Sequence, residues 1–294
     1  NMHLTGLEAL GAQVNIDHGY IEAKADRLIG NEIYFDIPTV TGTENLIMAA
    51  TLAKGTTTLR NAAREPEIVA LADALTLMGA KIKGAGTAIV TVEGVDTLSP
   101  ADISIIPDRI ETGTFMVAAA ATSGDVFIKQ CNPEHIGGVI SKLKATGSQI
   151  ETSEDSIHIK GCCPIKSVDI KTLPYPGFPT DMQAQFMTLM TIAEGNSVIH
   201  ESIFENRFIH ANELLRMGAD ISISGGNYAA VKGVKNLQGA EVMASDLRAS
   251  ASLVIAGLIA EGTTTISRVY HMDRGYEAIE NKFFNLGADI QRIK

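Results

Sequence analysis

The sequence predicts an α/β protein built from repeated α-β-α-β-β modules, and three observations support this fold class. A Gly-Ala or Gly-Ser step ends helix-like runs every 68 to 71 residues, at Gly11, Gly79, Gly147, Gly218 and Gly287. A second set of glycines, at positions 55, 124, 195 and 262, repeats every 67 to 71 residues, and each glycine closes an apolar run and opens a β-branched one. Between these markers the apolar spacing switches from helical to strand-like. A shared period of this length indicates one supersecondary unit used repeatedly.

The segment from Thr39 to Val95 shows the first half of a module clearly. Residues 43–45, Thr-Glu-Asn, offer N-cap chemistry ahead of the apolar run 46–50, and Gly55 stops the helix. Because this helix is apolar nearly all round, we expect it to be buried. The β-branched residues 56–59 then predict a strand.

The second half of the module adds an outer helix and a hairpin. Residues 65–67, Glu-Pro-Glu, open a helix that runs with apolar residues at helical spacing to Gly79, because proline is tolerated in a first turn. Residues 81–83 and 89–92 read as strands around a Gly-Ala-Gly turn. The glycines of this turn, and Gly225-Gly226 later, are better explained as hairpin turns than as phosphate loops.

The same order recurs from Asp108, Asp181 and Asp246, each of which opens a buried helix. An acidic side chain there complements free N–H groups, so helix capping is the simpler explanation of all three aspartates. Residues 1–35 supply only an outer helix and strands, and residues 289–294 a single strand. We therefore expect 1–106 to be the remainder of a three-module domain without its first module. Residues 107–294 would be a second three-module domain without its final strand partner.

Composition limits the classes of function. With 294 residues, 45% of them apolar, the chain can bury substantial cores, and a net charge of −10 argues against nonspecific binding to nucleic acid or an anionic membrane. No apolar run approaches the roughly 18 residues of a membrane helix, and no signal sequence begins the chain, so a cytoplasmic location is expected. The three cysteines are expected to be ordinary reduced thiols. The histidines lack metal-ligand spacing, and no cofactor is implied.

Three segments differ from plain scaffold. Prolines and a glycine at 174–179 form a stiff loop that delivers Asp181, whose carboxylate is a candidate general base. Arg248 stands at a helix start lined by small residues, which is a good anion site. Arg274 precedes another helix, and Arg207 occupies the equivalent place one module earlier. From the residues alone, an ion-paired or solvated role for these arginines is as reasonable as anion binding.

These segments resemble a known family. They are Phe178–Phe186 (FPTDMQAQF), Ser245–Ser252 (SDLRASAS) and Tyr270–Tyr276 (YHMDRGY), together with Arg64–Glu67 (REPE) and Pro107–Phe115 (PDRIETGTF). They closely resemble the UDP-N-acetylglucosamine 1-carboxyvinyltransferases, the enolpyruvyl transferases that begin bacterial peptidoglycan synthesis. The resemblance covers the whole chain. It implies the enolpyruvyl transferase fold, two inside-out α/β barrel domains, each of three modules about a pseudo-threefold axis, with substrates bound between the domains.

The resemblance also implies a reaction and a set of roles. Phosphoenolpyruvate would give its enolpyruvyl group to the sugar 3′-hydroxyl of UDP-N-acetylglucosamine through a tetrahedral adduct, with loss of phosphate. Asp181 would take the hydroxyl proton, and Arg248 and Arg274 would hold phosphoenolpyruvate. The further substrate-binding residues implied are Asn1, Met2, Ile37, Pro38, Thr39, Val40, Thr41, Ile203, Phe204 and Arg207.

Two departures from the family pattern bear on these roles. The family often has Ser-Val-Gly-Ala-Thr where this chain has Thr-Val-Thr-Gly-Thr at 39–43. The family's mobile loop, with the cysteine that acts as general acid, would lie before Asn1, and Cys131, Cys162 and Cys163 do not match it. We therefore expect the parent protein to be the transferase and these residues alone not to turn over. The alternatives are a shikimate 3-phosphate enolpyruvyl transferase and a noncatalytic ligand-sensing module of the same fold.

Overall fold

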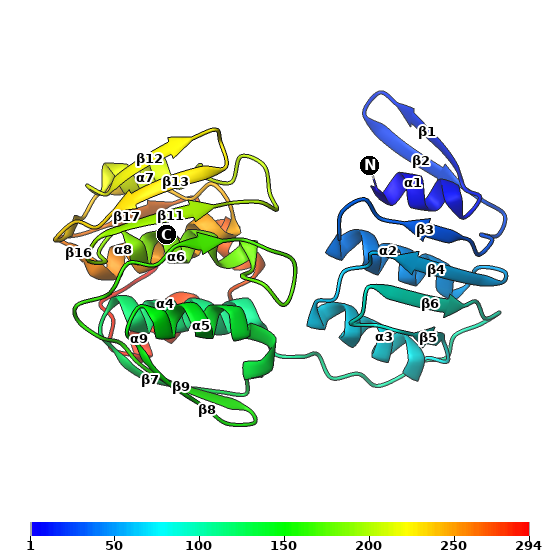
Figure 1. The fold of residues 1–294 in the computed structure, drawn as a ribbon, viewed down its shortest axis with the longest axis horizontal. Coiled ribbons are helices and arrows are strands. Elements are labelled where there is room, and N and C mark those ends of the chain that lie inside the picture. The colour runs from blue at the N-terminus through cyan, green and yellow to red at the C-terminus, as the bar shows by residue number, and fades with distance from the viewer. Residues whose placement is uncertain (1, 294) are drawn as a thin grey trace. The chain divides into compact units, whose positions relative to one another are not determined.

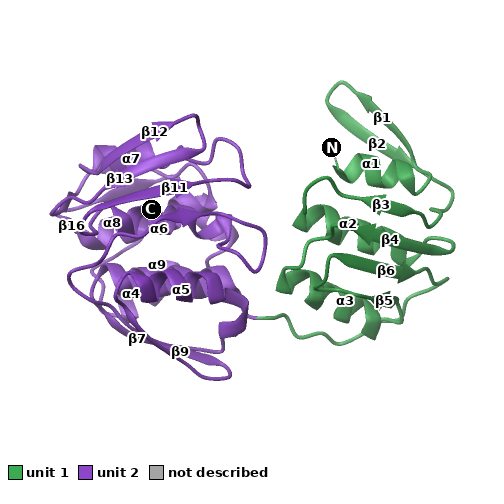
Figure 2. Ribbon diagram, viewed as in Figure 1, with its two compact units in different colours: residues 1–106 green, residues 107–294 purple. Residues whose placement is uncertain are grey.

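The chain folds as two compact units, Asn1–Ile106 and Pro107–Lys294 (Figures 1 and 2). This computed structural model describes residues 2–293. Each unit has its own hydrophobic core. The interpretation of the units as three-module domains that lack parts stays a prediction.

Unit 1 follows the predicted order of elements. Their bounds are α1 (Met2–Ala9), β1 (Gln13–Asp17), β2 (Tyr20–Lys24), β3 (Glu32–Tyr34), α2 (Val40–Thr51), β4 (Thr56–Arg60), α3 (Pro66–Leu77), β5 (Lys81–Lys83) and β6 (Ile89–Glu93). The main sheet has the order β3-β4-β6-β5, with β3 parallel to β4 and the other pairs antiparallel. Strands β1 and β2 form a separate hairpin. The predicted strand, outer helix and hairpin are all present, but the prediction that α2 is buried all round is wrong, because Thr41 and Met48 are exposed and only one side of the helix packs on the core.

The predicted start of α2 at residues 43–45 is wrong. Thr39 is the N-cap, and its Oγ1 accepts a hydrogen bond from the backbone N–H of Gly42 at 3.3 Å. Thr43 lies buried inside the helix, where its hydroxyl accepts a hydrogen bond from the backbone N–H of Ala63. Several residues in this stretch can cap, and the one in extended conformation, at φ −130°, sets the boundary.

Unit 2 contains two complete modules and one shorter one. The elements of the first are α4 (Arg109–Ala121), β7 (Asp125–Lys129), η1 (Pro133–Ile136), α5 (Gly137–Ala145), β8 (Gln149–Thr152) and β9 (Ser156–Lys160). Those of the second are β10 (Ile170–Lys171), η2 (Thr180–Met182), α6 (Gln183–Met190), β11 (Asn196–His200), α7 (Ala211–Arg216), β12 (Asp220–Ser224) and β13 (Tyr228–Lys232). Those of the third are β14 (Leu237–Gln238), β15 (Glu241–Met243), α8 (Leu247–Ile259), β16 (Ala260–Glu261), β17 (Thr265–Ser267), η3 (Val269–Arg274) and α9 (Ile279–Asn285).

The sheets of unit 2 repeat one arrangement. Their orders are β7-β9-β8 and β10-β11-β13-β12, with the short parallel pairs β14-β16 and β15-β17 in the third module. No sheet closes on itself in the described part of the chain. The predicted single strand over residues 289–294 is wrong for residues 289–293, which form no strand, while Lys294 lies outside the described residues. A strand needs another strand to pair with, and no strand of the described part of the chain pairs with these residues.

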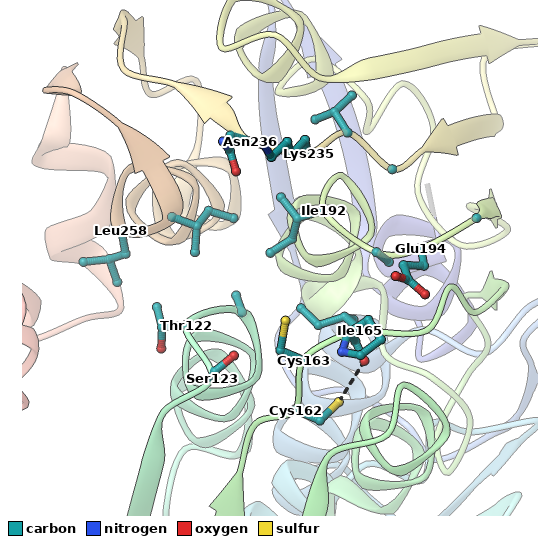
Figure 3. A pocket seen from close by; sticks show the side chains of 17 residues that line it. Thr122, Ser123, Cys162, Cys163, Ile165, Ile192, Glu194, Lys235, Asn236 and Leu258 are labelled. Atoms are coloured by element: carbon teal, nitrogen blue, oxygen red, sulfur yellow. Dashed lines mark hydrogen bonds between the residues drawn. The ribbon is translucent and has the colours of Figure 1, made fainter.

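The three buried helices α4, α6 and α8 pack against one another and form the centre of unit 2. Every residue of α6 is buried, as the apolar patterning predicts. Their C-terminal ends surround a depression of about 690 Å³, lined in part by Thr122, Ile192 and Leu258 (Figure 3). Their N-terminal ends are joined at the other end of the bundle by the polar contacts described below. The helices are therefore parallel, with their positive dipole ends together.

The cysteines and the glycine-rich turns agree with their simpler interpretations. All three cysteines are free, with Cys131 buried and Cys163 exposed. Gly84 and Gly86 lie between β5 and β6 with positive φ, as hairpin turns require. Among residues 2–293, no helix is both long enough and apolar enough to cross a membrane.

Candidate active site

Asp181 differs from the other two aspartates that open the buried helices. Asp108 caps α4 by accepting hydrogen bonds from Ile110 and Glu111, and Asp246 caps α8 in the same way. Asp181 lies within η2, which has Pro179 at its N-cap and no side-chain capping bond. Helix capping is therefore the right explanation for two of the aspartates and the wrong one for Asp181.

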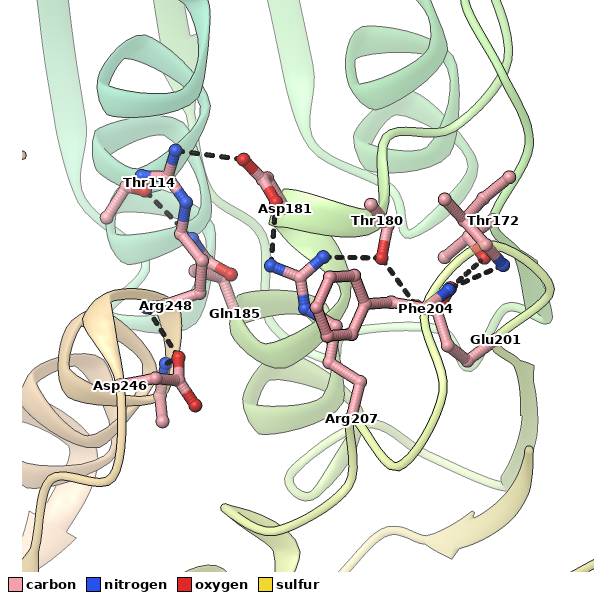
Figure 4. A network of polar contacts seen from close by, with 12 residues as sticks. Thr114, Thr172, Thr180, Asp181, Gln185, Glu201, Phe204, Arg207, Asp246 and Arg248 are labelled. Atoms are coloured by element: carbon pink, nitrogen blue, oxygen red, sulfur yellow. Dashed lines mark hydrogen bonds and ion pairs between the residues drawn. The ribbon is translucent and has the colours of Figure 1, made fainter. Parts of the chain in front are cut away.

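Two arginines hold the carboxylate of Asp181 (Figure 4). Nη2 of Arg207 lies 2.7 Å from Oδ1, and Nη2 of Arg248 lies 3.0 Å from Oδ2. Partial burial raises the pKa of Asp181, but attraction to Arg248 and Arg207 outweighs it, so the pKa lies below its ordinary value. This carboxylate is ionised at neutral pH.

The stiff loop before η2 fixes the position of Asp181. Phe178 is buried and packs edge-on against Phe186 of α6, with ring centroids 4.9 Å apart. The backbone N–H of Leu173 donates to the carbonyl of Phe178, and the N–H of Gly177 donates to that of Pro174. The loop is thus anchored at both ends, as its proline content predicts.

Arg248 is held from inside the helix bundle. Its Nη1 donates to the hydroxyl of Tyr276 at 3.3 Å, and that hydroxyl lies 2.8 Å from Oγ1 of Thr114 on α4. Nε2 of Gln185 on α6 donates to the same Thr114 oxygen at 3.2 Å. Burial lowers the pKa of Arg248, but Asp181 and Tyr276 reverse this, and the net pKa is raised. The guanidinium is therefore a fixed positive charge at the N-terminal end of the bundle.

Arg207 lies in the loop that follows β11 and contacts both η2 and a residue of its own loop. Its Nη1 donates to Oγ1 of Thr180 at 2.6 Å, and its guanidinium carbon lies 5.1 Å from the ring centroid of Phe204. Phe204 and Ile203 are exposed at 61% and 43%, so both side chains are available to a ligand. The structure brings these two predicted residues close to the Asp181 cluster through Arg207.

The remaining predicted residues do not join this cluster. Arg274 ends η3 and is exposed, and its side chain has no hydrogen bond or ion pair with any residue that the structure describes. Residues 37–41 and Met2 belong to unit 1, where Thr41 Oγ1 lies 3.4 Å from a ring nitrogen of His3. Asn1 lies outside the described residues. The binding roles of all these residues stay predictions.

Sequence reasoning did not single out four residues that support the two arginines. Three of them, Glu201, Thr180 and Thr114, are seen in Figure 4, and the fourth is Tyr276. Glu201 is only 2% exposed, although its sequence neighbours are polar. No periodicity marks these residues, because their roles come from hydrogen bonds to residues far away in the sequence. The described residues contain no group of three or more histidine, cysteine or acidic side chains that could hold a metal ion.

Comparisons with known proteins identify the family. The model of the EPSP synthase family (3-phosphoshikimate 1-carboxyvinyltransferase) matches residues 1–283. The chain is 72% identical over its whole length to a UDP-N-acetylglucosamine 1-carboxyvinyltransferase of Desulforapulum autotrophicum, of which it spans 70%. It is 63% identical, also along the whole chain and 70% of the relative, to the protein of that name in Desulfosudis oleivorans. The chain therefore belongs to the carboxyvinyl (enolpyruvyl) transferases, a family of enzymes.

Solved structures share the fold. The enolpyruvyl transferase NikO from Streptomyces tendae matches 99% of the chain and 72% of its own length, with a TM-score of 0.90 and 24% identity. An EPSP synthase from Acinetobacter baumannii matches 99% of the chain and 71% of its own length, with a TM-score of 0.73 and 22% identity. The enolpyruvyl transferase fold predicted from the sequence is thus confirmed. Within the family, the relatives that share high identity are the UDP-N-acetylglucosamine enzymes, so the shikimate alternative is not favoured.

Proposed function

We propose that the protein to which these residues belong transfers the enolpyruvyl group of phosphoenolpyruvate to the 3′-hydroxyl of UDP-N-acetylglucosamine. This would be the first committed step of peptidoglycan synthesis in the cytoplasm, and it would serve cell-wall formation, cell shape and division. The single observation that carries the proposal is 72% identity along the whole chain to a relative of that name. The arrangement of Asp181 between two arginines supports it, because the reaction needs a proton acceptor beside an anion site.

Asp181 is the proposed proton acceptor. In the reaction, the sugar oxygen bonds to C2 of phosphoenolpyruvate, its proton passes to the Asp181 carboxylate, and a general acid, the loop cysteine that the family resemblance implies, would protonate C3. The tetrahedral adduct then gives a proton from C3 back to a base as its C2–O bond to phosphate breaks, which restores the double bond and releases phosphate. Asp181 is ionised before substrate arrives, because Arg207 and Arg248 keep its pKa low.

In this mechanism, binding of an anionic substrate to Arg248 changes the basicity of Asp181. Its guanidinium is a strong partner for a carboxylate or phosphate of phosphoenolpyruvate, and it already faces the carboxylate of Asp181. A bound anion competes for Arg248 and weakens its hold on Asp181. The pKa of Asp181 then rises towards a value at which the carboxylate is a better base.

The other predicted residues complete the proposed site. Arg274 would hold the second anionic group of phosphoenolpyruvate, and Arg207 would position Asp181. Ile203 and Phe204 would contact the sugar and uracil, and the segment 37–41 would contact the nucleotide.

The experiment is phosphate release from phosphoenolpyruvate by the complete gene product, with either UDP-N-acetylglucosamine or shikimate 3-phosphate as acceptor. We expect release with the UDP-sugar only, and an enolpyruvyl ether at the 3′-oxygen by mass spectrometry. Release with shikimate 3-phosphate only would replace the proposal with the shikimate reaction. Binding of the UDP-sugar without release of phosphate would support a ligand-sensing module.

A further inference from the structure

Glu201 is a buried carboxylate that the proposed reaction does not use. It follows β11, is 2% exposed, and accepts four hydrogen bonds. A buried carboxylate is costly unless its oxygens are fully bonded, so these partners explain its stability at this place. They do not explain why a charged group is there, since a loop can be held by neutral acceptors.

The two oxygens of Glu201 face different parts of the site (Figure 4). Oε1 accepts from the hydroxyl of Thr172 at 2.7 Å and from the backbone N–H groups of Ile203 and Phe204 at 2.9 and 3.0 Å. Oε2 accepts from the hydroxyl of Thr180 at 2.8 Å. One oxygen therefore fixes the exposed loop at 203–204, and the other reaches the residue directly before Asp181.

The bond to Thr180 continues to the carboxylate of Asp181. Because the Thr180 hydroxyl gives its proton to Glu201, its oxygen lone pair is available to Arg207, whose Nη1 donates to it at 2.6 Å. Nη2 of the same guanidinium donates to Oδ1 of Asp181 at 2.7 Å. In this series of hydrogen bonds the neutral Thr180 hydroxyl joins the carboxylate of Glu201 to the guanidinium of Arg207, and each bond sets the direction of the next.

We propose that Glu201 is a positioning residue that acts through Thr180 to hold Arg207, and thereby Asp181, in register with the loop at 203–204. The inference rests on the proposed function, in which Asp181 accepts the proton and that loop contacts the UDP-sugar. Glu201 would thus align the proton acceptor with the acceptor substrate, without itself touching either.

Thr180→Val and Thr180→Ser test the link to Asp181 and leave the bonds of Glu201 Oε1 intact. In the complete gene product, we expect Thr180→Val to lower kcat roughly tenfold, the factor that matches the loss of one hydrogen bond to a charged group. The KM for UDP-N-acetylglucosamine should stay within about twofold, because the loop at 203–204 remains held. Thr180→Ser keeps the hydroxyl and should restore kcat.

Glu201→Gln tests the carboxylate at the start of this series of hydrogen bonds. Its amide oxygen can still accept from the loop N–H groups, but its –NH₂ then faces Thr180 as a donor and reverses that bond. We expect kcat to fall as in Thr180→Val, and the double variant to be no worse than either single one, since both break the same link. Glu154→Gln, the same change at an exposed site of unit 2, should leave kcat unchanged.

A carboxyl titration keeps this inference separate from the proposed function. With ¹³C-labelled aspartate, NMR follows the ionisation of Asp181 without turnover, and Thr180→Val should raise its pKa, because Arg207 is no longer fixed. If the unaltered protein releases no phosphate, the proposed function fails, and the titration still decides the inference. An Asp181 titration or kcat that is unchanged in Thr180→Val, or not restored in Thr180→Ser, would overturn it, even if Glu201→Gln fails to fold.

Discussion

Asp181 and Arg248 are the residues whose chemistry depends most on each other. Each is partly buried, and each shifts the pKa of the other in the direction that favours its charged form. The pKa of Asp181 is depressed, so this carboxylate stabilises the folded chain above the ordinary Asp value of about 3.9. That contribution is lost as the pH falls through the lower folded value.

Arg248→Met removes the first of the two charges that depress the pKa of Asp181. We expect the Asp181 pKa to rise, because burial, which already raises it, would be opposed by Arg207 alone. The measurement is a ¹³C carboxyl titration of the labelled protein. Arg216→Met, at a guanidinium side chain that is 64% exposed, is the control and should leave the Asp181 titration unchanged. An unshifted pKa in Arg248→Met would show that the ion pair does not set the ionisation of Asp181.

His210 should make folding stability depend on pH in a second window. Its complete burial lowers its pKa from 6.5 to about 4, although the charge of Asp246 and a hydrogen bond with the backbone of Arg207 act in the opposite direction. Between these values the unfolded chain binds a proton that the folded chain excludes, so stability falls as the pH drops from 6.5 towards 4. The loss is about 3 kcal/mol at most, at about 1.4 kcal/mol per pH unit.

The measurement is the free energy of unfolding in urea between pH 7.5 and pH 4.5, followed by circular dichroism. His210→Gln should flatten this pH dependence, because the unfolded chain loses the group that takes up the proton. His18→Gln, at a histidine side chain that is 91% exposed, should keep the steep dependence of the parent chain. Equal slopes for His210→Gln and the parent would contradict the assignment.

At the scale of elements, the aspartates at the starts of α4 and α8 are structural. Asp108→Ala should lower the free energy of unfolding by about 1 kcal/mol, because two backbone N–H groups at the start of α4 lose their acceptor. Asp108→Asn keeps an acceptor oxygen and should lose much less. Thermal and urea unfolding of the two variants measure this, and equal destabilisation would show that charge rather than capping matters at residue 108.

The elements themselves were largely predictable from sequence. The module order follows from local signals, such as proline at the first turn of α3 and glycine with positive φ after its end. The strand expected over 289–294 failed because a strand also depends on a partner elsewhere, which a local pattern does not contain. The predicted start of α2 was wrong for a different reason, because neighbouring threonines offer equivalent capping chemistry.

The site was predictable only in part, for a physical reason. Asp181, Arg207 and Arg248 could be selected because their motifs resemble a family, but their contacts span 26 and 67 residues of sequence. No sequence pattern marks Glu201, because its contacts arise only when β11 pairs with β10 in the folded chain. Nothing in the pattern at 108, 181 and 246 shows that the middle aspartate alone faces arginines.

At the scale of the whole molecule, the thiols lead to a prediction about activity. Cys131 is buried, which raises its pKa, and Cys162 and Cys163 line the depression at the C-terminal ends of α4, α6 and α8. Asp181 lies at the opposite ends of these helices from Cys162 and Cys163, and the Sγ of the buried Cys131 donates to the carbonyl of Ile128, so none of the three thiols is placed to protonate a substrate at Asp181. We expect the purified 294-residue chain, of 31.2 kDa, to release no phosphate from phosphoenolpyruvate with UDP-N-acetylglucosamine. Release by a sample of that intact mass would contradict this.

The most direct measurement is kcat for Asp181→Asn in the complete gene product, together with the Kd for UDP-N-acetylglucosamine by calorimetry. If Asp181 accepts the hydroxyl proton, kcat should fall by about 10² to 10⁴, while the Kd changes by less than about tenfold. A kcat within about threefold of the unaltered protein would show that the carboxylate between Arg207 and Arg248 is not the proton acceptor.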